Sequence, residues 1–268
     1  MKTLKFKTLL LALVSAVTMS SCLNDSEVTD YPTYSSYVTV SGDAFFGYTF
    51  HSDFGCTLLP TSESILEVIP GLNNTKVERL YVAFDLVPES ENGKQLEPGR
   101  TYKIALKSAY GSNIAIPTYS TIDTYSTQAA IDSLTTKNGS INAFNSNIWA
   151  INGYANAEMT ILYDYNKPFY MNAYYNHETD IDLVNKTVNL NIYYNNNAST
   201  PIQTGRSVFS FNLPQGAASE FLRNGFSGND SITLVMRAMV DHSMQLAPVG
   251  ECKMSINDFY KPGDSQIF

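Results

Sequence analysis

Three alternating segments between Met159 and Tyr194 constrain the fold more than any other part of the chain. In each segment, one set of mostly apolar residues alternates with a more polar set. A period of two places the two sets on opposite faces of a β-sheet. We therefore predict strands over 159–165, 169–176 and 187–194, with the apolar sets facing a core. These inward sets are Met159, Ile161, Tyr163 and Tyr165; Phe169, Met171, Ala173 and Tyr175; and Val188, Leu190, Ile192 and Tyr194.

The opposite face of the last two strands is rich in tyrosines and amides. Tyrosine offers a large contact area at low entropy cost, and amides both donate and accept hydrogen bonds. This mixture suits a neutral glycan better than a charged ligand. The same residues would also make an ordinary solvated face, on which cross-strand pairs only support the sheet. If the two strands are neighbours, the candidate ligand-binding residues are Tyr170, Tyr174, Tyr193, Asn172, Asn189 and Asn191.

The N-terminus has the pattern of a secretion signal. Lys2, Lys5 and Lys7 precede an apolar run over 9–17 that is too short to span a bilayer. The residues just before Cys22 resemble a bacterial lipobox, which implies removal of residues 1–21 and acylation of Cys22 as a lipid anchor. Cleavage by the ordinary signal peptidase is the alternative. The expected location is the bacterial outer membrane, facing either the periplasm or the cell surface.

The charge of the chain excludes one class of partner. The formal net charge is −8, and removing residues 1–21 takes away three lysines and no acids, which moves it to −11. A chain this acidic repels nucleic acid phosphates and anionic lipid head groups. No other apolar run is long enough to cross a membrane. The expected partners are the membrane, through the anchor, and a glycan or a protein.

The rest of the chain divides into two all-β domains. Residues 22–33 are a polar tether, and short strand signals at 36–40, 45–50, 56–60, 79–86, 100–108 and 113–117 predict a small barrel of the OB type over 34–117. Residues 61–76, between the strand signals at 56–60 and 79–86, hold two turn signals. The Ser/Thr-rich stretch 118–140 is expected to be a linker. Residues 141–268 predict an antiparallel β-sandwich, with the single Trp149 anchoring its core beside the alternating strands. Its later elements are strands at 207–213, 231–240 and 252–256 and a short helix over 217–225.

No motif in the sequence specifies catalysis. The segment 225–229 (GFSGN) lacks the last glycine of a nucleophile elbow and is not preceded directly by a strand, so we interpret it as a turn. The three histidines, His51, His177 and His242, are far apart in the sequence. A hydrolase whose carboxylate pair or triad forms only in space stays open as an alternative.

No metal or cofactor site is expected either. Glu178, Asp180 and Asp182 offer oxygen ligands suited to calcium, but they lack the pattern of an EF-hand loop and fall where a hairpin turn is expected. Cys56 and Cys252 form no CxxC motif and are expected to be separate small apolar residues, although a disulfide would persist outside the cytoplasm.

The layout as a whole resembles the NigD-like lipoproteins of Bacteroidetes. The resemblance lies in the lipoprotein signal, the segments CTLLP, VERLYVAFDL and TYKIALKS, the connecting IDSL, and the sandwich opening at NIWAINGYANAEMTILYDY. It implies an N-terminal OB-type domain and a C-terminal sandwich, and it supplies no catalytic residues. We therefore expect a non-catalytic cell-envelope lipoprotein that serves as a binding or accessory module. The alternatives are a glycan-active hydrolase and a bacteriocin-associated immunity or export accessory protein.

Overall fold

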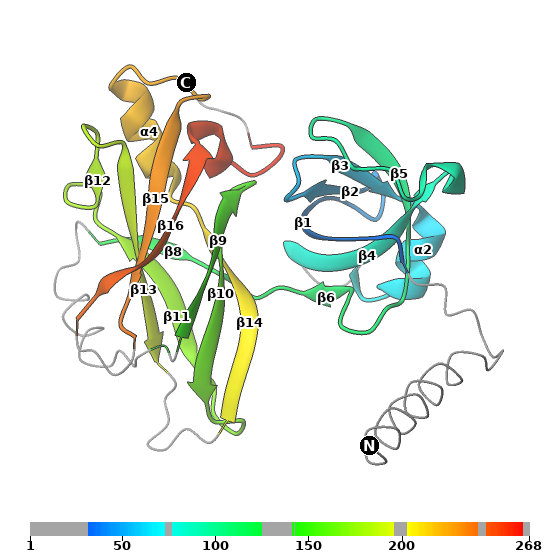
Figure 1. The fold of residues 1–268 in the computed structure, drawn as a ribbon, viewed down its shortest axis with the longest axis horizontal. Helices are drawn as coiled ribbons and strands as arrows, with labels where there is room; N and C mark the ends of the chain where they lie inside the picture. Colours follow the sequence, from blue (N-terminus) through cyan, green and yellow to red (C-terminus); the bar gives the residue numbers. More distant parts are fainter. Residues whose placement is uncertain are drawn as a thin grey trace, which may run out of the picture. The chain divides into compact units, whose positions relative to one another are not determined.

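A computed structural model describes residues 32–72, 77–124, 141, 143–195, 203–240 and 245–264 of the chain. Over these residues the chain forms a β-barrel followed by a two-sheet sandwich, so the predicted all-β class is confirmed (Figure 1). The predicted signal peptide, Cys22 and most of the expected tether lie outside the described residues, and so do residues 125–140 and His242.

The first domain is a barrel with the strand order of the OB fold. Its sheet runs β1-β2-β3-β5-β4, and β4 pairs with β1 to close it, while β6 adds to the outer side of β4. Only β3 and β5 are parallel. The inward residues Val38, Phe50, Leu58, Val82 and Ile104 are fully buried. The strands are β1 (Tyr34–Asp43), β2 (Gly47–Ser52), β3 (Thr57–Pro60), β4 (Arg79–Val87), β5 (Thr101–Leu106) and β6 (Ile114–Ala115).

Two local features of the barrel differ from the sequence expectation. The segment expected to hold only turns contains a short helix, α2 (Ser62–Val68), whose first turn is capped by the Thr61 hydroxyl. A threonine followed by Ser-Glu-Ser is an N-cap signal that the turn dipeptides further along obscured. The first strand of the hairpin is longer than predicted, and the second begins at Gly47, so Phe45 and Phe46 lie at the tip, 94% and 92% exposed, instead of starting the second strand. A one-turn 3-10 helix, η2 (Glu89–Glu91), lies in the β4–β5 connection.

The second domain consists of two mixed sheets. One runs β7-β14-β10-β9 and the other runs β16-β15-β13-β11-β8, with β12 paired to β13 (Figure 1). The first contains β7 (Thr118–Tyr119), β14 (Gln203–Asn212), β10 (Tyr154–Tyr163) and β9 (Ala143–Ile151). The second contains β16 (Ala247–Ser255), β15 (Ser231–Ala238), β13 (Thr187–Asn195), β11 (Tyr170–Tyr175), β8 (Thr121–Asp123) and β12 (Ile181–Asp182). Helix α4 (Gln215–Arg223) and the 3-10 helix η3 (Ile256–Phe259) complete the domain.

The alternation that predicted these strands is confirmed. Met159 and Ile161 of β10, Met171 and Ala173 of β11, and all four inward residues of β13 are buried in one core that both sheets share. Tyr165 is the exception, because β10 ends at Tyr163 and leaves it 77% exposed. The predicted helix near 217–225 is also confirmed, and it ends before Gly225, whose φ of +86° suits the left-handed backbone after a helix.

The sandwich is not purely antiparallel as expected. After β13 the chain crosses to the other sheet as β14, then returns through α4, so β15 runs parallel to β13. A crossover of this length permits parallel pairing, which a tight hairpin does not. The short strands β7 and β8 are also parallel to their partners β14 and β11.

The first residues of the expected linker belong to the sandwich. Thr118–Tyr119 pair with β14 and Thr121–Asp123 pair with β11, so this segment contributes one edge strand to each sheet. Serine and threonine suit short edge strands as well as loops, and strands of two or three residues are too short to show a period. The domain boundary therefore lies before Thr118, and the remainder of the expected linker, 125–140, is outside the described residues.

Candidate functional site

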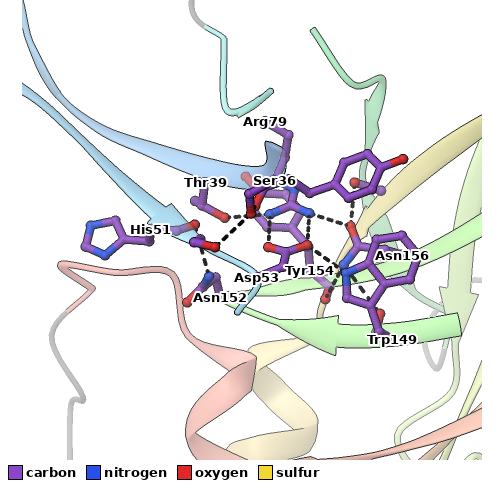
Figure 2. Close-up of polar contacts among 12 residues, drawn as sticks. Ser36, Thr39, His51, Asp53, Arg79, Trp149, Asn152, Tyr154 and Asn156 are labelled. Atoms are coloured by element: carbon purple, nitrogen blue, oxygen red, sulfur yellow. Dashed lines mark hydrogen bonds and ion pairs between the residues drawn. The ribbon is translucent and has the colours of Figure 1, made fainter. Parts of the chain in front are cut away.

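A buried ion pair lies where the barrel meets the sandwich. The side chain of Arg79, at the start of β4, is 0% exposed, and its two terminal nitrogens each lie 2.7 Å from a different carboxylate oxygen of Asp53 (Figure 2). Asp53 follows β2 directly and is itself only 9% exposed. Parallel hydrogen bonds between guanidinium and carboxylate are strong and directional, which suits a desolvated site.

Two side chains of the sandwich complete this cluster. Trp149 Nε1 of β9 donates to Asp53 Oδ2 at 2.6 Å, and Arg79 donates to Asn156 Oδ1 of β10 at 3.0 Å (Figure 2). The same amide oxygen accepts from Ser210 of β14 at 2.6 Å. Trp149 therefore anchors the junction between the two domains, not the sandwich core as predicted. Its indole N–H needs a buried acceptor, and the barrel supplies it.

A second set of contacts crosses the junction beside the first. The Tyr154 hydroxyl donates to Glu78 Oε2 at 2.9 Å, and Lys261 Nζ lies 3.2 Å from the same oxygen. The Arg79 guanidinium stacks 5.2 Å from the centre of the Tyr154 ring. Burial raises the pKa of Tyr154 far above its usual value, so the hydroxyl stays protonated and keeps donating. These contacts join the end of the barrel at Glu78 and Arg79 to the sandwich at Tyr154 and Lys261.

The barrel also places a serine beside a histidine. The Ser41 hydroxyl lies 2.9 Å from His51 Nε2, between paired strands β1 and β2. Burial lowers the pKa of His51, so the ring is neutral at physiological pH. The Ser41 hydroxyl also hydrogen-bonds the Thr49 carbonyl oxygen at 3.3 Å. Neither residue lines the 520 Å³ cavity or the 160 Å³ cavity that the described residues form. The pair has the spacing of a nucleophile and its base but lies outside both of these cavities.

The tyrosines and amides predicted as a ligand platform do share one face. Strands β11 and β13 are antiparallel neighbours in which Tyr170 faces Asn195, Asn172 faces Tyr193 and Tyr174 faces Asn191. Tyr174 and Tyr193 are only 6% and 9% exposed and contact each other edge to face, with ring centres 5.0 Å apart. Tyr170 alone is widely exposed, at 60%. A stacking ligand would therefore reach one of the three rings, and the binding role of this face stays a prediction.

The acidic segment after β11 does not converge on a metal site. Asp180 is buried and accepts hydrogen bonds from the backbone N–H of Asn176 and from Asn191 Nδ2, both at 3.0 Å, and its burial raises the pKa of the carboxyl group. Asp182 instead accepts from Asn185, which lowers the pKa of its carboxyl group. In the part of the chain that the structure describes, no group of three or more His, Cys, Asp or Glu side chains is placed to hold a metal ion.

The structure also places the remaining candidates from the sequence. Cys56 and Cys252 are both free thiols, the first buried in the barrel and the second half-buried against the sandwich core. Residues 225–229 form the connection between α4 and β15, where Asp230 accepts a hydrogen bond from the Ser227 backbone N–H at 2.7 Å. His177 Nδ1 lies 2.6 Å from a carboxylate oxygen of Asp123 on β8.

Sequence reasoning missed the cavity that Asp123 lines. This cavity of about 520 Å³ lies at the end of the sandwich where β8, the start of α4 and the turn after η3 meet. Tyr175, Gln215, Lys261 and Asp264 contribute to its wall. Asp123 and Asp264 are 141 positions apart in the sequence, and no sequence pattern connects the residues of the cavity wall. Asp123 was expected in a linker and Tyr175 in the core.

The fold and the junction define a two-domain all-β protein, an OB-type barrel joined to a sandwich. No protein-family model matches the sequence, and no curated protein matches it. Among solved structures, a toxin-related protein from Parabacteroides distasonis is 16% identical with a TM-score of 0.55, over 84% of this chain and 94% of that one. A protein of unknown function from Bacteroides vulgatus is 15% identical with a TM-score of 0.54, over 82% and 89%.

A NigD-like immunity protein from Bacteroides caccae has the same architecture. It is 15% identical with a TM-score of 0.50, and the alignment covers 84% of this chain and 98% of that one. At these identities the comparisons show a shared fold only, and they carry no information on activity. They support the resemblance to the NigD-like lipoproteins, whose implied order of barrel and sandwich is the order observed.

Proposed function

We propose that this chain is a non-catalytic accessory lipoprotein of the bacterial outer membrane that acts by binding a ligand or partner at the cell envelope. The observation that carries this proposal is that polar side chains around the 520 Å³ cavity are hydrogen-bonded to one another. Asp123 is paired with His177 at 2.6 Å, and Asp264 is paired with Gln215 at 2.9 Å. Polar groups that line a cavity and hold one another in place offer a ligand fixed hydrogen-bonding partners, as the few polar groups of a binding pocket do.

The way the two domains are joined favours the same function. Arg79, Asp53, Trp149 and Asn156 fix the barrel to the sandwich through desolvated hydrogen bonds. An enzyme that closes over its substrate needs a hinge, whereas a binding protein gains affinity from a body that is already rigid.

The membrane part of the proposal rests on the N-terminal sequence. A lysine-rich start, a short apolar run and Cys22 resemble a lipoprotein signal, and the tether to Tyr34 would let the barrel stand clear of the bilayer. Within the described ranges, no helix is both long and apolar enough to span a bilayer. The names of two fold neighbours, an immunity protein and a toxin-related protein, favour an accessory role linked to bacteriocin defence.

Detergent phase separation tests the anchor. The parent chain, expressed in a bacterium that processes lipoproteins, should enter the Triton X-114 phase, and the Cys22→Ser variant should stay in the aqueous phase or keep its signal peptide. Protease treatment of intact cells then distinguishes the surface from the periplasm. A Cys22→Ser chain that is cleaved normally and still enters the detergent phase would contradict lipid anchoring at this residue.

The competing function is hydrolysis, and the Ser41–His51 hydrogen bond of 2.9 Å is the observation that favours it. A fluorophosphonate probe reacts with a serine that an adjacent base activates. We expect the parent chain to be labelled no more than the Ser41→Ala variant. Labelling of the parent that is lost in both Ser41→Ala and His51→Gln would establish an activated serine and overturn the non-catalytic assignment.

A further inference from the structure

The 520 Å³ cavity of the sandwich has three walls that come from distant parts of the chain. One wall is the segment from Ser120 to Asp123, which leads into and includes the edge strand β8. The second runs from Asn212 to Gln215, between the end of β14 and the first residue of α4. The third is the turn that follows η3. The volume falls within the roughly 300–1,000 Å³ that is typical of small-molecule sites.

The floor of the cavity is apolar and ordered. Phe259 of η3 and Leu213 are 1% and 5% exposed, and both line the cavity. Tyr175 also lines it, with its hydroxyl held beside the backbone of Gly216, where a Cβ atom would lie only 2.6 Å from the hydroxyl oxygen. Because these side chains are almost completely buried, the polar groups of the walls supply most of the surface that a ligand would contact.

The polar walls favour a neutral ligand over an anion. Two carboxylates, Asp123 and Asp264, line the cavity with one ammonium group, that of Lys261. The ammonium is already engaged, because Lys261 Nζ lies 3.2 Å from Glu78 and 4.8 Å above the centre of the Tyr154 ring. An anionic ligand would therefore meet two acids and a cation whose charge is already compensated.

Asp123 and Asp264 are the two carboxylates of the cavity, and among the described residues no group of three or more His, Cys, Asp or Glu side chains is placed to hold a metal ion. Asp123 is held by His177 at 2.6 Å, and Asp264 accepts from Gln215 Nε2 at 2.9 Å and from the Lys261 backbone N–H at 3.2 Å. Each carboxylate keeps further lone pairs with which to accept from a hydroxyl group, because an ionised carboxylate offers about four acceptor sites. Gln215 is exposed, and its amide oxygen can accept in the same way.

We infer that this cavity is a binding site for a neutral mono- or disaccharide. The carboxylates and the Gln215 amide would accept hydrogen bonds from neighbouring hydroxyl groups of the sugar. This inference deepens the proposed binding function and rests on it. It also moves the sugar site away from the sheet face at Tyr170, on which two of the three tyrosine rings are buried.

A glycan array followed by calorimetric titration tests the site with the full chain carrying Cys22→Ser. The array holds neutral mono- and disaccharides beside sialylated and sulfated sugars, and the best-bound sugar is used in the titration. Asp123→Asn removes one acceptor charge with little change in shape, and Gln215→Trp fills the cavity from an exposed position. Each variant should weaken binding at least tenfold, with its circular dichroism spectrum and melting unchanged.

Two control variants test whether a loss of binding is specific to the cavity. One controls for a general effect of removing negative charge, and the other for binding at the sheet face. Glu251→Gln removes one exposed negative charge from β16 outside the cavity, and Tyr170→Ala removes the one widely exposed ring of the predicted sheet platform. Both should bind like the parent. Binding that survives Gln215→Trp but is lost in Tyr170→Ala would overturn the cavity and leave a sugar-binding function in place.

Two results with the parent chain would also overturn the inference. A parent chain that binds only charged sugars would overturn the neutral ligand class, and one that binds no sugar would overturn the inference as a whole. Neither result bears on lipid anchoring, which the detergent separation of the Cys22→Ser variant measures by itself.

Discussion

Replacing Asp53 by asparagine should destabilise the whole protein, because it leaves Arg79 charged and without its partner inside the junction. Arg79 is 0% exposed and makes both of its shortest contacts, at 2.7 Å, with this one carboxylate. Asparagine keeps the shape but has a single acceptor oxygen. Its amide has two possible orientations, and each turns the N–H₂ group toward a hydrogen-bond donor. In one orientation the N–H₂ group faces one terminal nitrogen of Arg79, and in the other it faces the second terminal nitrogen and Trp149 Nε1.

Removing one partner of a buried ion pair costs about 3–5 kcal/mol. With a urea m-value of about 1–3 kcal/mol/M, the unfolding midpoint should fall by about 1 M or more. The Glu97–Arg100 pair is a matched control, because its side chains are 61% and 59% exposed. Glu97→Ala should change the free energy of unfolding by about 0.5 kcal/mol or less.

Urea unfolding followed by two signals measures this effect. Fluorescence of Trp149, the only tryptophan, reports the junction, and circular dichroism reports both domains. In the parent the two transitions should coincide. An Asp53→Asn variant that loses no more stability than Glu97→Ala would show that the fold does not depend on this buried ion pair. A parent in which fluorescence changes well before the circular dichroism would show that the junction does not hold the two domains together.

The barrel, the sandwich and their connection each offer one more test. Burial lowers the pKa of His51, so the folded protein resists protonation of this ring more than the unfolded chain does. The free energy of unfolding should therefore decline as the pH falls below 6.5. In urea titrations at several pH values, a His51→Gln variant should show a weaker dependence of this free energy on pH. Gly153→Ala should lower the free energy of unfolding by at least about 1 kcal/mol more than Gly225→Ala, as measured by thermal melts. Both glycines have positive φ, but only at Gly153 does a backbone atom lie 3.0 Å from the added Cβ. Equal losses of stability would contradict this. Cleavage at a protease site inserted within 125–140 should yield two fragments that still co-elute in gel filtration, because the junction contacts and the pairing of β7 and β8 with the sandwich hold them together; fragments that separate would show that these contacts contribute little.

Periodicity predicted the parts of the fold that depend on one face being buried. The strands around Met159, Met171 and Leu190 were recognisable because their alternation matches the pleat of a half-buried sheet, and the core confirms it. The short strands β7 and β8 escaped prediction because two or three residues cannot show a period. The parallel pairing of β15 depends on a crossover through the other sheet, which no local pattern encodes.

The candidate site was harder to predict than the fold for a physical reason. The junction cluster joins Asp53 to Trp149 across 96 positions, and each of these residues alone is ordinary in its local sequence. The same holds for Asp123 and Asp264 in the cavity wall. The tyrosine platform shows the opposite case: β11 and β13 are neighbours and the residues share one face as expected, but the burial of Tyr174 and Tyr193 depends on contacts beyond the two strands.

The most direct test of the central claim, that the chain binds its ligand without converting it, is mass spectrometry of sugars recovered after incubation with the parent chain. Oligosaccharides that bind on the array are incubated in excess over protein for many hours, and every soluble product is quantified. We expect the sugars to be recovered with their masses and amounts unchanged while binding is saturable. Cleaved products in molar excess over the protein, absent from a heat-denatured control, would show turnover and contradict it.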